Sequence, residues 1–83
     1  MNALHELGIM FNIVETVTNF ANQNNITKID TLVLEIGNMS PVVPSYIEAC
    51  YPAAADGTLL QDTKLKIEIV SGKDFIIKEI VAC

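Results

Sequence analysis

The chain has 83 residues, enough for one small domain, and 51% of them are hydrophobic. Its net charge is −5, with ten acidic and five basic residues, so it lacks the clustered cations with which nucleic-acid-binding proteins neutralise phosphates. No apolar run approaches the roughly 20 residues that a membrane span needs, and no basic start precedes an apolar core as in a signal peptide. We therefore expect a single domain over residues 1–83, in the cytoplasm, that binds neither nucleic acid nor membrane.

The first expected element is an amphipathic helix over residues 4–24, because apolar residues recur there at spacings of three and four. The recurring residues are Leu7, Met10, Val14, Val17 and Ala21. Asn24 and Asn25 tolerate the left-handed conformation that ends helices. Three further apolar residues widen the stripe beyond what one sheet face requires: Phe11, Ile13 and Phe20. We expect this excess to serve as a contact surface for another chain.

A strand is expected over residues 29–36, with Leu32, Leu34 and Ile36 on one face. A second helix follows after Gly37, beginning somewhere within residues 41–44, since proline is favoured in a helix's first turn. It should continue to residue 55. Pro52 falls inside this helix, where it lacks a backbone donor and clashes with the preceding turn, so a kink or restart is expected.

Two more strands are expected over residues 64–70 and 74–81, the first with its inward face formed by Leu65, Ile67 and Ile69. In the last strand Ile80 falls out of register, which predicts a bulge near Lys78. A Ser-Gly turn at residues 71–73 suggests that these two strands form an antiparallel hairpin. The helix between the first two strands allows a right-handed parallel crossover. The expected fold is α+β, with two helices packed on one face of a small three-stranded mixed sheet.

The reactive side chains are few and scattered. There is one histidine and no arginine, and carboxylates such as Glu35, Glu48 and Glu68 are usually solvated when they lie on strands and helices. Cys50 and Cys83 form no Cys-x-x-Cys pair, which favours free thiols in a reducing compartment; the first is expected in the core and the second exposed. We therefore expect no enzymatic activity.

Two segments carry a resemblance to a known family. Segment 4–9 reads Leu-His-Glu-Leu-Gly-Ile, and segment 35–44 reads Glu-Ile-Gly-Asn-Met-Ser-Pro-Val-Val-Pro. They resemble the Met-His-Glu-Leu opening and the Glu-Ile-Gly-x-Leu-Ser-x-Val-x-Pro stretch of the HypA/HybF nickel metallochaperones, which deliver nickel during hydrogenase and urease maturation. The resemblance continues through residues 57–59, 65–68 and 71–72 to 77–80, so it covers nearly the whole chain.

The resemblance implies a metal site at His5 and Glu6. Nickel would be held by the His5 imidazole and by nitrogens at the start of the chain, with Glu6 contributing through its backbone and, as an open alternative, its side chain. Nitrogen donors in a planar array suit nickel(II). However, His5 follows four residues instead of a lone methionine, so the terminal amine lies three residues too far upstream to close the same ring. Either Leu4 stands where the natural initiator methionine would be, or the natural chain begins at Met1 and the site is altered or lost.

The family also carries a long insertion between its last two strands, with two Cys-x-x-Cys-like pairs that hold structural zinc. Here Val70 runs directly into Ser71, and two cysteines cannot supply four ligands, so no zinc is expected. Two functional interpretations remain open. The chain is a nickel-binding, metallochaperone-like accessory protein in the maturation of a nickel enzyme such as hydrogenase, with a maturation GTPase and a metalloenzyme precursor as partners. Alternatively, it is a non-metal docking or regulatory module that keeps the fold. The apolar content favours a homodimer in either case.

Overall fold

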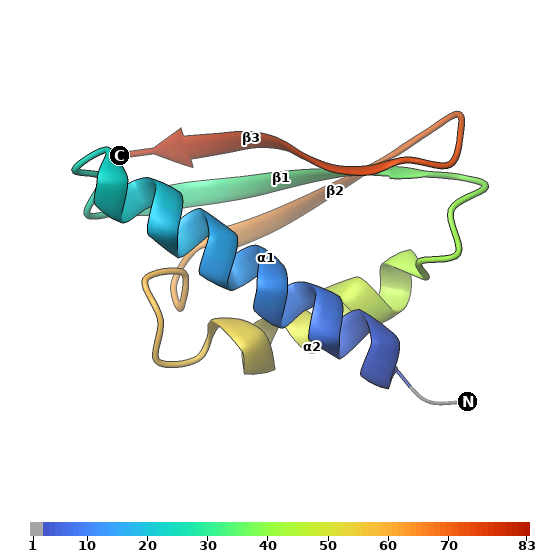
Figure 1. The fold of residues 1–83 in the computed structure, drawn as a ribbon, viewed down its shortest axis with the longest axis horizontal. Coiled ribbons are helices and arrows are strands. Elements are labelled where there is room, and N and C mark those ends of the chain that lie inside the picture. The colour runs from blue at the N-terminus through green and yellow to red at the C-terminus, as the bar shows by residue number, and fades with distance from the viewer. Residues whose placement is uncertain (1–2) are drawn as a thin grey trace.

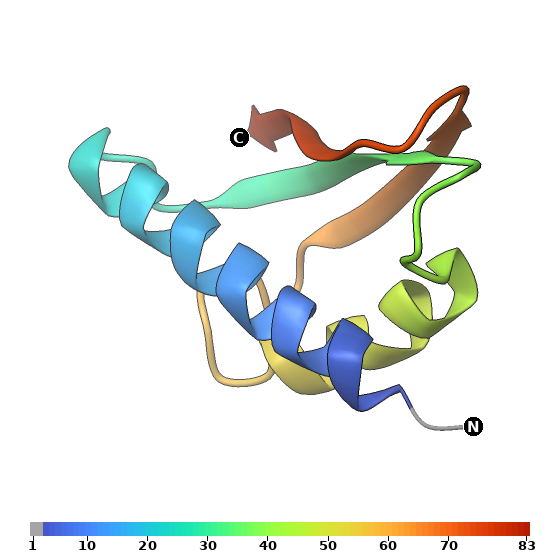
Figure 2. The ribbon, with the colours of Figure 1, turned by 45° about the vertical axis from the view of Figure 1, so that its right-hand side comes forward.

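The protein is described here by a computed structural model covering residues 3–83. Its elements follow the chain in the order α1 (Leu4–Gln23), β1 (Ile29–Gly37), α2 (Pro44–Ala55), β2 (Lys64–Val70) and β3 (Phe75–Ala82). The two helices lie on the same side of the sheet in the two views of Figures 1 and 2. The predicted α+β class, with two helices and a three-stranded mixed sheet, is confirmed. Within residues 3–83, neither helix has the length and apolar character needed to cross a membrane.

The strand order is β2-β1-β3, with β1 parallel to β2 and antiparallel to β3. The predicted hairpin between the last two strands is therefore wrong, because β1 lies between them. The physical reason is the burial of β1 on both faces: Leu34 is fully buried on the helix side, and Val33, on the opposite face, is only 4% exposed. A strand with apolar residues on both faces belongs in the centre of a sheet, where its backbone pairs along both edges.

The turn between β2 and β3 crosses the end of β1 at Gly37. The Gly37 amide donates to the Asp74 carbonyl at 2.7 Å, and the Met39 amide donates to the Gly72 carbonyl at 2.8 Å. The approach is so close that a Cβ on Gly37 would collide with the Gly72 carbonyl group and lie 2.8 Å from the Lys73 nitrogen. Only glycine fits at this crossing.

The predicted bulge in the last strand is confirmed at Lys78. Val33 pairs with Glu79 and Leu34 pairs with Ile77, which leaves Lys78 as the extra residue of β3. Its ammonium group donates to Glu68 Oε1 at 2.7 Å and lies 3.6 Å from Glu35 Oε2. The hydrogen bond from Lys78 is the main reason that the pKa of Glu68 is lowered. Lys78 of β3 thus pairs with one carboxylate on β2 and one on β1.

The core lies between the helices and the covered face of β1. On α1 the predicted stripe is buried at all but its first position. At that position the prediction was wrong, because Leu7 is only half-buried while the neighbouring Glu6 is 4% exposed. On α2 the helix continues through Pro52 as a single element, so no restart occurs. Ile69, predicted to face the core, is 56% exposed, because it lies near the end of an edge strand beside the central Ile36.

Candidate functional site

His5 lies in the first turn of α1 and its side chain is 65% exposed. The imidazole Nδ1 lies 3.7 Å from Glu6 Oε2, and solvent reaches the ring freely. An exposed imidazole at a helix end is available to a metal ion without any loss of core packing. The structure therefore leaves the predicted ligand His5 accessible.

Glu6 has a different environment, although it is the next residue. Its side chain is 5% exposed, and its Oε2 accepts a hydrogen bond from the Val43 backbone N–H at 3.2 Å. This bond is the main reason that the pKa of Glu6 lies below its ordinary value; burial opposes the effect, and the adjacent His5 adds to it. Of the two predicted site residues, His5 faces solvent and the Glu6 carboxylate is held inside the protein.

The bond from Glu6 to Val43 joins the two segments that carry the family resemblance. They lie 37 residues apart in sequence, and in Figures 1 and 2 the start of α1 and the connection from β1 to α2 lie at the same end of the molecule. The connection is ordered by bonds of its own, since Ser40 Oγ accepts from the Val42 amide at 3.1 Å and Met39 bonds to the β2–β3 turn. The two motifs are thus joined at Glu6, the residue next to His5.

The thiols contribute little to this unit. Cys50 is partly buried, and its Sγ lies 3.8 Å from the Ala3 carbonyl oxygen; Cys83 is exposed, as predicted. Within residues 3–83, no three side chains of His, Cys, Asp or Glu come together as a metal-binding group.

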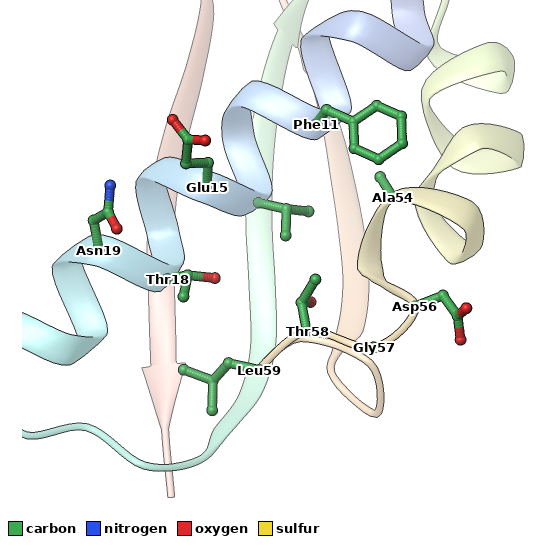
Figure 3. Close-up of a pocket in the computed structure, with 10 residues that line it drawn as sticks. Phe11, Glu15, Thr18, Asn19, Ala54, Asp56, Gly57, Thr58 and Leu59 are labelled. Atoms are coloured by element: carbon green, nitrogen blue, oxygen red, sulfur yellow. The ribbon is translucent and has the colours of Figure 1, made fainter.

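A cavity of about 570 Å³ lies between α1 and the connection from α2 to β2 (Figure 3). The half-exposed Phe11 ring lies beside Ala54 at its wall. Thr18 Oγ1, which also lines the cavity, is the one buried side-chain oxygen or nitrogen in residues 3–83 that has no hydrogen-bond partner. Neither His5 nor Glu6 lines this cavity, so it is separate from the candidate metal site. Because about half of its surface is exposed, Phe11 is partly available for contact with another chain.

Comparisons with known proteins agree with the two motifs. The family described as "Hydrogenase/urease nickel incorporation, metallochaperone, hypA" matches residues 4–81. The hydrogenase maturation factor HypA of Geobacter sulfurreducens is 39% identical over 70 residues, which are 84% of this chain and 61% of that protein. The corresponding factor of Trichodesmium erythraeum is 39% identical over 69 residues, which are 83% of this chain and 58% of that protein.

A solved structure shares the fold. The solution structure of the Ni metallochaperone HypA from Helicobacter pylori superposes with a TM-score of 0.72 at 17% sequence identity, covering 94% of this chain and 92% of that one. The chain spans about 60% of the length of the curated relatives that it matches. A family match over nearly the whole chain, with relatives close to 40% identical, settles its membership. The chain belongs to the HypA family of hydrogenase and urease nickel incorporation proteins.

Proposed function

We propose that this protein is a nickel-binding accessory protein of the metallochaperone type that acts in the maturation of a nickel enzyme such as hydrogenase. The observation that carries the proposal is the union of the two family motifs around an exposed histidine: Glu6 of the first motif bonds to Val43 of the second, and His5 beside it faces solvent. A carrier must both bind its metal and release it. A site at an exposed helix end suits that task better than a closed cage of side chains would.

The proposed site consists of His5 and the backbone nitrogens around it, with Glu6 as its neighbour. The metal is the protein's cargo rather than a resident cofactor. Backbone nitrogens and an imidazole in a planar array favour nickel(II) over ions that prefer oxygen ligands. We expect no structural zinc, because a closed zinc site requires four ligands and the two cysteines of the chain cannot supply them.

The implied partners are a maturation GTPase and the precursor of the metalloenzyme, and the proposed compartment is the cytoplasm. The family consists of maturation factors, and we propose that the chain itself catalyses no reaction. We also propose that it forms a homodimer through α1. Phe11 supports this contact, because it is 50% exposed on α1 and exposed aromatic side chains are enriched at protein interfaces. Phe20, which is 46% exposed, lies on the opposite flank of α1, beside β3.

A nickel titration followed by absorbance tests the function. With a free N-terminal methionine in place of Leu4, the protein should bind one nickel(II) per chain and show the yellow ligand-field band of a planar nitrogen site. His5→Ala should abolish this band. The chain that starts at Met1 should bind more weakly, because its amine cannot close the same ring. Equal nickel affinity with and without the His5 imidazole would falsify the site and favour the alternative of a non-metal docking module.

A further inference from the structure

We propose that Glu6 is a positioning residue: its carboxylate fixes the first turn of α1 against the start of α2 and is not a nickel ligand. The inference rests on the proposed function of His5 and assigns a separate task to its neighbour. Successive residues of a helix point about 100° apart. Holding Glu6 inward therefore keeps the His5 side chain, which is 65% exposed, turned toward solvent.

The start of α2 explains why a hydrogen-bond acceptor is needed at this point. The first N–H groups of a helix lack intrahelical acceptors, and the N-cap residue Val43 has no side chain that could accept a hydrogen bond. In a capping box, a glutamate three residues into the helix accepts the N–H of the N-cap residue. The residue at that position here is Tyr46, which has no carboxylate. Glu6 supplies the missing acceptor from another helix, at 3.2 Å from the Val43 nitrogen.

Two further features keep the carboxylate in place. The negative charge lies at the N-terminal end of α2, where the helix dipole stabilises anions. The oxygen that accepts the Val43 N–H is also the one that faces the His5 ring, 3.7 Å from Nδ1. If this Oε2 entered the coordination shell of a metal, the Val43 N–H would lose a charge-assisted hydrogen bond inside the protein. Carboxylates that remain outside the shell commonly orient the histidine ligand.

Hydrogen exchange of the Val43 amide in the metal-free 83-residue chain tests the positioning contact directly. Glu6→Ala should accelerate exchange at Val43 and shift its amide resonance. Glu6→Gln should preserve most of the protection, because the amide oxygen of glutamine still accepts the bond. Glu15→Ala is the matched control, since it removes an exposed carboxylate from the same helix and should leave Val43 unchanged. Unaltered exchange in Glu6→Ala would overturn the proposal.

Nickel binding by the same variants separates a positioning group from a ligand. Glu6→Ala should weaken nickel binding by about 10–100-fold, the usual effect of removing a group that orients a ligand. Glu6→Gln should restore both the affinity and the position of the absorbance band, whereas equal loss in the two variants would refute the positioning role. Val14→Ala provides the stability control, because a weakened core alone should leave nickel affinity unchanged.

Failure of this inference is distinguishable from failure of the proposed function. If His5→Ala leaves nickel binding intact, the proposed site is wrong whatever the Glu6 variants show. If His5→Ala abolishes binding while Glu6→Gln and Glu6→Ala both lower the affinity and shift the band, the site stands and the positioning role is refuted.

Discussion

The crossing of the β2–β3 turn over β1 leaves no room for a side chain at Gly37. Replacing it with alanine introduces a Cβ that collides with the carbonyl group of Gly72, which is backbone and cannot rotate away. The turn must then move from the end of the strand. Three bonds hold it there: Gly37 N–H to Asp74 O at 2.7 Å, Met39 N–H to Gly72 O at 2.8 Å, and Gly72 N–H to Asn38 Oδ1 at 3.2 Å.

Each of these bonds contributes roughly 0.5–1.5 kcal/mol, so displacement of the turn should cost about 2–4 kcal/mol of unfolding free energy. For a domain of this size 1 kcal/mol corresponds to a shift of about 4–8 °C in Tm. Gly37→Ala should therefore lower Tm by on the order of 10–30 °C. Thermal and urea unfolding followed by far-UV circular dichroism measures both quantities.

Gly8→Ala is the control, because it makes the same chemical change where a Cβ meets no atom within 4 Å. Gly8 lies within α1, and alanine is favoured over glycine in a helix by about 1 kcal/mol. This variant should be more stable than the wild type, so the two substitutions should have effects of opposite sign. A Gly37→Ala protein as stable as the wild type would refute the close crossing.

The remaining predictions concern association, alkaline stability and zinc. Phe11→Glu should weaken a dimer in sedimentation more than it destabilises the fold, whereas Leu34→Ala should cost about 2–5 kcal/mol of stability; equal unfolding by both would place Phe11 in the core. Burial raises the pKa of Tyr51 to about 12, above the usual value near 10. The contribution of this hydroxyl to the free energy of unfolding is therefore present below pH 10 and should be lost as the pH rises from about 10 to 12. Tyr51→Phe should remove that part of the alkaline unfolding transition. It should also cost about 1–3 kcal/mol of stability at neutral pH, since the hydroxyl lies 3.2 and 3.0 Å from the Leu60 and Thr63 carbonyl oxygens. An unchanged alkaline profile would contradict the role given to the Tyr51 hydroxyl. Purified protein should contain no stoichiometric zinc, and a chelator that unfolded it would show otherwise.

Local patterns in the sequence predict the individual elements well. The spacing of Met10, Val14 and Val17 identifies the buried stripe of α1, and the misplaced Ile80 reveals the bulge at Lys78. These features depend on residues close to one another in the chain. The order of the strands does not, because a Ser-Gly turn looks the same whether its two strands pair or flank a third. The signal for the correct order was Val33, an apolar residue on the face of β1 that the helices leave uncovered.

The candidate site is also predictable only in part, because local patterns identify some of its residues but not the contacts between distant ones. His5 was identified from a motif and is exposed as an accessible ligand must be. The buried position of Glu6 was not predicted, because carboxylates usually lie in solvent and its partner is a backbone N–H at Val43, 37 residues away. One signal was present in the sequence: the second helix begins Val-Pro, without the Ser, Thr, Asp or Asn that normally caps a helix. An uncapped start calls for an acceptor from elsewhere in the fold.

The central claim is that His5 holds nickel in this chain, and equilibrium dialysis against nickel(II) tests it most directly. Three proteins suffice, each with a free N-terminal methionine in place of Leu4. They are the protein with His5 intact, His5→Ala, and His5→Ala combined with Asn22→His, which places a histidine at an exposed position at the other end of α1. One nickel per chain is expected for the first protein and none at the same free nickel concentration for the other two. Nickel bound equally by all three, or recovered by the displaced histidine, would contradict a specific site at His5.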